Sequence, residues 1–344
     1  MRFLLCAITH LGQDGYFRVQ KEAAYNTLVS NSMTFLPLTE GTLSYEQMKI
    51  EKANIINSRL PQLWENGRKA VTGELTFPLV PDLVGMMFNM FIGVETAVSG
   101  NGTTAPYTHT FLMPVTGLNA GVSWSVEQAI GSDLADQYSG VKCSKIVLKS
   151  DAEGYMQAVM TLIGVDRNDN DVARATTITI STKKFYSFCN GLVEVTPVGV
   201  SKFTQKVDAF ELTLDMGYDE DGLRYKVGSC SPDTPIFGTI PKVSLKLDID
   251  AERRYEDWAI DNKQFAIDIT LTSSEIAVNS IPYSIGIELP AMILPSGTKR
   301  EAGQDNLKMS LEFSHLGGTT TGSGTVAVPA EIRVVDMTTT YTGY

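Results

Sequence analysis

Histidine and cysteine are scarce in this chain, which has 3 His and 4 Cys among 344 residues. The residues concerned are His10, His109 and His315, and Cys6, Cys143, Cys189 and Cys230. None of the histidines has a ligand partner at metal-binding spacing, and the cysteines form no CxxC pair. No GxSxG or HExxH sequence occurs. We therefore expect no enzyme, no cofactor and no metal centre, and we interpret His109 as a structural residue on a strand.

Basic residues are also in short supply, because 28 Lys and Arg face 39 Asp and Glu, giving 28 − 39 = −11. A protein that grips nucleic acid through its phosphates carries a basic footprint, so this balance argues against such binding. Long apolar runs are absent as well, and none approaches the roughly 20 residues that a membrane helix needs. The apolar stretch within Met1–His10 is shorter than that of a signal peptide. We expect no membrane association.

Alternating apolar and polar residues dominate what is present. Five segments follow this pattern: 210–216, 243–249, 265–271, 283–289 and 307–313. Successive side chains of a strand point to opposite faces, so each segment has one apolar and one polar face. Such strands belong to antiparallel sheets that pack on one side, as in sandwiches and barrels. The sequence therefore predicts a mainly β fold.

Two helices are expected beside the strands. Pro81 followed by Asp82 is typical of a helix start, and the apolar residues up to Ile92 complete a helix over 81–92. Tyr255 and Trp258 stand three residues apart in a second helical segment, 251–260. The methionines of the first helix are interpreted as core residues.

The two halves of the chain resemble each other. The segment 71–75, which precedes the first helix, matches 243–247, which precedes the second, at an offset of 172. Three further matches keep the same order: 122–127 with 283–288, 141–144 with 307–310, and 156–162 with 331–335. We therefore expect an N-terminal arm (1–30), a first β domain (31–170), a linker or arm (171–200) and a second β domain (201–344).

A succession of short motifs carries a family resemblance. Lys69-Ala-Val-Thr-Gly-Glu-Leu-Thr-Phe77 leads into the first helix, and Tyr107-Thr-His-Thr-Phe111 and Val122-Ser-Trp-Ser-Val-Glu127 follow. Tyr138-Ser-Gly-Val-Lys-Cys-Ser-Lys-Ile-Val-Leu148 comes next, and then Gly154-Tyr-Met-Gln-Ala-Val-Met-Thr-Leu-Ile-Gly-Val-Asp166. In this order the motifs resemble those of the major tail tube proteins of long-tailed (siphovirus-type) bacteriophages. The likeness covers roughly residues 20–340 and is looser in the second half.

The resemblance implies two tandem tail-tube-like β-sandwich domains, each with a flanking helix, that contribute strands to an oligomeric β-barrel. Such subunits form stacked rings around a channel for the genome. A ring would contain three two-domain copies of this chain, or six copies if the halves are not duplicates. The implied partners are other copies of the chain, the tape measure protein and other tail proteins, with DNA passing without specific binding. The implied location is the virion tail, after assembly in the host cytoplasm.

An acidic channel lining suits DNA passage, because it repels phosphates and lets the duplex slide. Six acidic residues on polar faces of the expected strands are candidates for this lining: Asp208, Glu211, Asp215, Asp248, Asp250 and Asp268. Each of them could equally lie on an ordinary solvated outer face.

Two other functions stay open at this point. One is a different ring component of a phage tail, such as a terminator or a baseplate hub. The other is a secreted carbohydrate-binding or adhesin-like β-sandwich, although Trp64, Trp124 and Trp258 are too scattered in the sequence to predict an aromatic platform.

Overall fold

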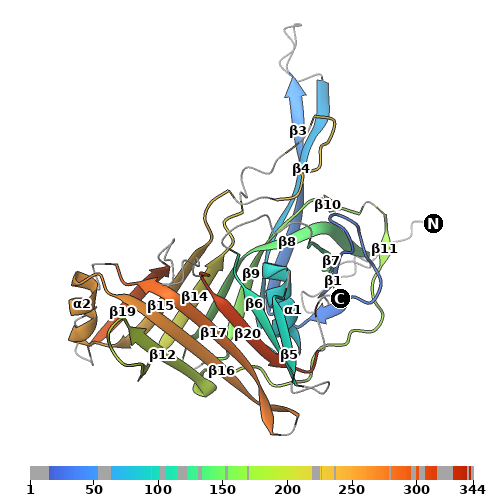
Figure 1. Ribbon diagram of the computed structural model, residues 1–344. Coiled ribbons are helices and arrows are strands. Elements are labelled where there is room, and N and C mark those ends of the chain that lie inside the picture. The colour runs from blue at the N-terminus through green and yellow to red at the C-terminus, as the bar shows by residue number, and fades with distance from the viewer. Residues whose placement is uncertain are drawn as a thin grey trace.

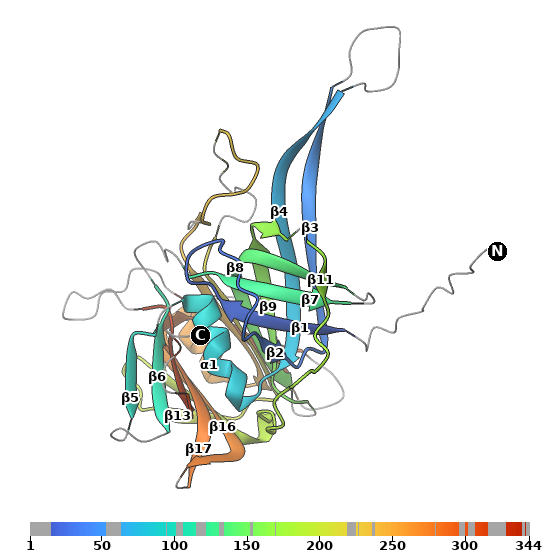
Figure 2. The ribbon, with the colours of Figure 1, turned by 90° about the vertical axis from the view of Figure 1, so that its right-hand side faces the viewer.

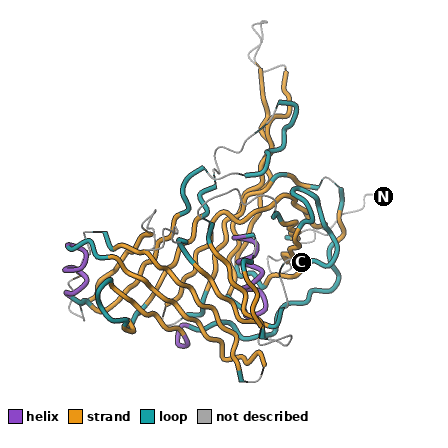
Figure 3. Tube along the Cα trace, in the orientation of Figure 1, coloured by secondary structure: helices purple, strands orange, loops and turns teal. Residues whose placement is uncertain are grey.

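A computed structural model provides the fold of the chain. It describes residues 15–52, 63–93, 95–100, 106–114, 122–130, 134–151, 154–168, 170–218, 225, 227–235, 238–278, 280–295, 300–301, 307–315, 328–338 and 341. Strands make up most of the body, as Figure 3 shows, and the described helices are few and short. The expectation of a mainly β fold is confirmed. No described helix has both the length and the apolar character needed to cross a bilayer.

One layer of the fold is a run of antiparallel strands that crosses the whole molecule (Figure 1). Its order is β3 (Glu40–Lys52), β4 (Leu63–Pro78), β9 (Gln157–Gly164), β8 (Leu134–Asp151), β14 (Ala209–Asp215), β15 (Lys242–Asp250) and β19 (Lys308–His315). Beyond β19 lie β18 (Arg300–Glu301) and the end of β17 (Ile281–Ile293), which both pair with it. We call this run the long sheet.

The remaining strands form the second layer. In the first half of the chain they are β1 (Tyr16–Lys21), β2 (Thr34–Leu36), β7 (Trp124–Ala129), the start of β8, β10 (Asp166–Arg167) and β11 (Val172–Ala173). In the second half they are β12 (Gly191–Pro197), β13 (Phe203–Gln205), β16 (Gln264–Val278), β17 and β20 (Glu331–Asp336), continued by β6 (Tyr107–Leu112) and β5 (Ala97–Gly100). Apolar residues of both layers, such as Leu212 and Ile287, belong to one buried cluster.

The same pattern of strand neighbours occurs twice along the chain. β1 pairs with β2 and β7, as β12 pairs with β13 and β16. The order β3–β4–β9 recurs as β14–β15–β19, and β7–β8 recurs as β16–β17. Even a local irregularity is repeated, since the register shifts between Trp124 and Val126 on β7 and between Phe265 and Ile267 on β16.

These pairings support only part of the sequence alignment of the halves. The segments before the two helices, β4 and β15, correspond at the expected offset of 172. The match of 122–127 with 283–288, in contrast, aligns β7 with β17, whereas the neighbour pattern aligns β7 with β16. The reason is the additional pair β5–β6, which lies between the first helix and β7, whereas the described residues between α2 and β16 include no such pair.

Helix α1 (Pro81–Ile92) lies against the sheets and is buried around almost its whole circumference. Proline in its first turn and Asp82 favour its start, and Gly93 ends it with a φ of 95° and an N–H bond to the Asn89 carbonyl. Helix α2 (Arg253–Ile260) lies at one end of the long sheet and buries Tyr255 and Ala259 (Figure 1). A short 3-10 helix, η2 (Phe188–Asn190), precedes β12.

Parts of the expected arm and linker are strands. Residues 16–21 form β1, a strand of the second layer whose Tyr16, Phe17 and Val19 are buried. Residues 191–197 form β12, which pairs along its whole length with β16. Residues 176–180, where Ile178 and Ile180 alternate with threonine, are not a strand, and both isoleucines are exposed.

Two features of the long sheet shape the molecule. β3 and β4 extend well past the rest of the sheet, as Figures 1 and 2 show, since β9 covers only Val71–Pro78 of β4. β8 belongs to both layers: its first part pairs with β7 and its last part with β14.

Gly140 lies in the first part of β8 and has a φ of 66°, which glycine adopts more readily than other residues. An added Cβ at this position would also clash with the side chain of Val165.

Candidate functional site

The long sheet has one buried face and one polar face. On β14, Phe210, Leu212 and Leu214 are buried in the core, whereas Glu211 between them is exposed. The same alternation holds along β15 and β19, and along the parts of β4, β8 and β9 that lie in this layer. The outward residues therefore form a continuous polar surface across both halves of the chain, which we call the polar face.

Charges on the polar face alternate from strand to strand. The strand register places two rows of residues side by side: Lys149, Glu211, Lys246 and Glu312 in one, and Lys145, Asp215 and Lys242 in the other. Opposite charges directly across a strand pair contribute about 0.2–1 kcal/mol each. These rows therefore stabilise the junction between β8, β14 and β15, and they neutralise much of its acidity.

Acidic residues without a lysine opposite lie elsewhere on the polar face. Glu40 and Glu74 on β3 and β4 lie opposite threonines in the strand register, and Glu46 lies opposite Ala70. All three acids are exposed. Three acidic residues at the β3–β4 end of this face therefore lack the lysine neighbours that Glu211 and Asp215 have on β14.

The structure brings five of the six predicted acids to one surface. Glu211, Asp215, Asp248 and Asp250 lie on the polar face, and Asp208 directly precedes β14. Asp208 forms an ion pair with Lys308 at 2.9 Å, which raises the pKa of that lysine.

Asp268 lies apart from the other five, on β16 in the second layer. There Lys202 binds both Asp268, at 2.9 Å, and Glu194, at 2.8 Å. The sequence analysis missed Glu40, Glu46 and Glu74 and the alternating lysines. The alternation in the sequence could have indicated these residues. On β15, for example, Lys242 and Lys246 are separated from Asp248 by even numbers of residues and therefore lie on the same face of the strand.

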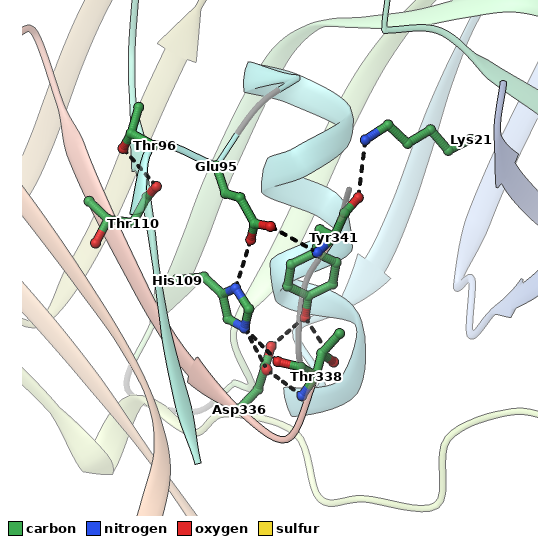
Figure 4. Close-up of polar contacts among 8 residues, drawn as sticks. All are labelled: Lys21, Glu95, Thr96, His109, Thr110, Asp336, Thr338 and Tyr341. Carbon is green, nitrogen blue, oxygen red and sulfur yellow. Dashed lines mark hydrogen bonds and ion pairs between the residues drawn. The ribbon is translucent and has the colours of Figure 1, made fainter. Parts of the chain in front are cut away.

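A closed polar cluster holds the C-terminal segment (Figure 4). His109 on β6 is fully buried; its Nδ1 lies 2.8 Å from Glu95 Oε2 and its Nε2 lies 2.8 Å from the Thr338 carbonyl. Asp336 Oδ1, at the end of β20, is 3.2 Å from the same Nε2. Both ring nitrogens face acceptors, so the doubly protonated imidazolium satisfies the cluster best. His109 is thus structural, as the sequence predicts.

Tyr341 completes this cluster, which we call the clasp. Its ring packs edge-on to His109 at 4.8 Å between centroids, and its hydroxyl donates to Asp336. Its backbone N–H donates to Glu95, and its carbonyl accepts from Lys21 on β1 (Figure 4). The clasp therefore joins the chain end to strands of both halves.

Raising the pH is expected to weaken the clasp. Burial alone would lower the pKa of His109, but the hydrogen bonds that its ring donates to Asp336 and Glu95 outweigh burial and raise the pKa above its ordinary value of 6.5. The resulting stabilisation is complete below pH 6.5 and is lost as the pH rises through the raised pKa, by about 1–3 kcal/mol. We expect the melting temperature to fall over this range in the native protein, but to stay low and flat in His109→Gln. A flat profile in the native protein would contradict the argument.

The described residues thus form a broad antiparallel sheet with one polar face and a long edge strand. The family of the chain comes from comparison with known protein families, because the family model described as phage tail tube protein matches residues 12–333. The chain therefore belongs to the phage tail tube family, as its motifs predict, and is a structural component of the virion. A search of curated proteins found no significant match.

Proposed function

We propose that this chain is the major tail tube subunit, which closes rings that stack around a channel for phage DNA. The observation that carries the proposal is the long sheet, whose polar face spans both halves of the chain. Among the described residues, its first strand, β3, pairs only with β4, so no strand covers the other side of β3. Edge strands of this length invite pairing, and ring closure supplies it.

The long sheet divides into two groups of four strands. β3, β4, β9 and β8 form the first group, and β14, β15, β19 and the edge made by β17 and β18 form the second. The groups join inside the chain through β8 and β14. We propose that each group, with its second layer and helix, is one tail-tube domain, spanning β1–β10 and β12–β20. The first then begins before residue 31 and the second before residue 201.

Three chains would supply six such groups to a ring. About 24 strands spaced about 4.8 Å apart give a circumference of roughly 115 Å, and thus a diameter of roughly 37 Å, which strand tilt increases. Barrels of 16–18 strands already leave a water-filled channel, so this ring would be open. A trimer with pseudo-sixfold symmetry follows.

The polar face would line the channel. Its net negative charge repels phosphates, so DNA would pass without specific binding. Five of the sequence candidates remain in this lining, Asp208, Glu211, Asp215, Asp248 and Asp250, and we add Glu40, Glu46 and Glu74. Asp268, on the second layer, would face outward. We further propose that the tape measure protein and other tail proteins are partners of these rings, and that the rings assemble in the host cytoplasm.

The internal β8–β14 junction predicts the register between chains. Thr42 on β3 corresponds to Glu211 on β14, because they lie opposite Glu74 and Lys246, which are 172 positions apart. The same comparison aligns Glu301 on β18 with Lys149 on β8. Glu301 lies opposite Lys308, which lies opposite Asp250 on β15. Lys149 lies opposite Gln157, which lies opposite Pro78 on β4, and positions 78 and 250 are again 172 apart. Glu211 lies opposite Lys149 inside the chain. Thr42 should therefore lie opposite Glu301 of the next copy.

A disulfide between these positions tests the proposal. Thr42→Cys with Glu301→Cys, in a background with serine at positions 6, 189 and 230, should cross-link chains under oxidation. Their Cα atoms should be about 4.5 Å apart, within disulfide range. On a non-reducing gel we expect a ladder that stops at three chains, and rings in electron micrographs.

Thr42→Cys alone serves as the control and should give at most dimers. A ladder that stops at six would exclude the trimer. Rings that form without any cross-link would refute the register, and a protein that stays monomeric at all concentrations would refute the tube.

A further inference from the structure

The free edge of β3 is already hydrogen-bonded within the chain. The Leu43 N–H donates to Gln128 Oε1 at 2.8 Å, and the Leu43 carbonyl accepts from the Tyr138 hydroxyl at 3.3 Å. In an antiparallel strand the N–H and C=O of one residue point to the same side. Gln128 and Tyr138 therefore occupy the side of β3 that faces away from β4, where a neighbouring strand would bind.

These two side chains come from the second layer. Gln128 lies on β7 and is partly buried, and Tyr138 lies on the first part of β8 and is 3% exposed. Burial raises the pKa of Tyr138, so its hydroxyl remains a donor throughout the neutral range. Both reach across the end of the core to the edge of the long sheet.

The second half of the chain provides an internal comparison. The register shift that β7 and β16 share aligns Val126 with Ile267. Val126 lies opposite Tyr138 and Ile267 lies opposite Leu289, so Tyr138 corresponds to Leu289. Gln128 and Ile269 each lie two residues further along β7 and β16, so they correspond as well. Leu289 and Ile269 are fully buried and apolar. They have no hydrogen-bonding side chain to offer to the corresponding strand.

That corresponding strand, β14, is paired. Leu212, the counterpart of Leu43, lies opposite Leu148 on β8, so a strand already covers its edge. Thus the two second-layer positions next to the open edge of β3 hold the polar residues Gln128 and Tyr138. The same positions next to β14, whose edge is covered by β8, hold apolar residues. This contrast follows from the cost of leaving a buried N–H or C=O without a partner.

We propose that Gln128 and Tyr138 form a removable cap on β3, which satisfies Leu43 in the free chain and is displaced when a second copy of this chain adds its strand there. This inference rests on the proposed tube function. The cap competes with strand addition, so it keeps free chains apart and lets assembly proceed only where a growing ring offers the full edge. Natural β proteins protect open edges by comparable means.

The test replaces both cap residues by apolar ones, which matches the apolar character of Ile269 and Leu289 in the second half. Gln128→Ile with Tyr138→Phe keeps the side-chain volume and removes both hydrogen bonds. We expect the critical concentration for tube formation, measured by sedimentation and electron microscopy, to fall roughly tenfold relative to the native protein. Gln128→Glu keeps the acceptor oxygen and should assemble at the native concentration. Melting curves establish that each variant is folded, and Gln128→Ile alone is used if the double variant is not.

The outcomes separate the two proposals. An unchanged or higher critical concentration in the uncapped variant would overturn the cap, while the assembly of the native protein would leave the tube function standing. If folded native and uncapped proteins both remain monomeric at every concentration, the tube function fails and the cap fails with it. A fall of the same size in Gln128→Glu would also overturn the cap.

Discussion

Phage carrying Glu40→Lys, Glu46→Lys and Glu74→Lys in this chain should assemble complete tails and yet lose infectivity by roughly 100-fold or more. The three acids are exposed and face neutral partners, so their reversal disturbs few contacts within the sheet. In a trimeric ring the change would place nine new lysines around the channel, repeated at every level of the tube. Lysines that contact phosphates bind DNA through counterion release, which would hold the genome in the tail. The measurement is plaque-forming units per particle counted by electron microscopy, together with DNA release in vitro.

The control variant reverses an equal number of acids outside the polar face, at Glu256, Asp257 and Asp261 on and after α2. It should retain native infectivity. Because phosphate binding weakens as salt rises, the defect in DNA release should shrink at high ionic strength. Normal infectivity of the triple variant would exclude the polar face as the channel lining.

The second large effect concerns the clasp. Tyr341→Ala is expected to destabilise the fold by about 3–5 kcal/mol, because it removes a ring that is 1% exposed together with its hydrogen bond to Asp336. The ring packs against Gly85 on α1, where an added Cβ would overlap the tyrosine. Gly85→Ala should therefore also destabilise the protein, although alanine favours a helix more than glycine does. Chemical denaturation measures both changes.

The double variant makes this prediction sharp. Once Tyr341 is alanine, the overlap is gone, so Gly85→Ala should become neutral or stabilising by up to about 1 kcal/mol. The sign of the Gly85 effect thus depends on the residue at position 341. If Gly85→Ala stabilises the protein in both backgrounds, the packing argument is wrong.

Periodicity alone was enough to locate much of the fold. The five alternating segments became β14, β15, β16, β17 and β19, and the first helix has its predicted bounds, 81–92. These elements are dictated locally, because burial of one face imposes the spacing of apolar residues. Strand partners are not local. β14 pairs with β8, which lies some 60 positions earlier, and nothing in either segment specifies that neighbour.

The site could be predicted only in part for the same reason. Alternation shows that Asp268 and Glu211 lie on polar faces, but it does not show that they belong to different layers. The clasp was beyond sequence reasoning, because His109 meets Thr338 across 229 positions. The cap on β3 likewise depends on a contact between residues 85 positions apart.

The passage of β8 from one layer to the other has a mechanical consequence. Its 18 residues pair with β7 at one end and with β14 at the other, so a single peptide backbone runs from one layer to the other. In a tube built as proposed, a force that slides one layer past the other would act on the covalent backbone of β8 and on its hydrogen bonds to β7 and β14. Side-chain packing between the layers would carry less of that force. Such a tail would resist bending, and its channel would keep a circular cross-section under tension.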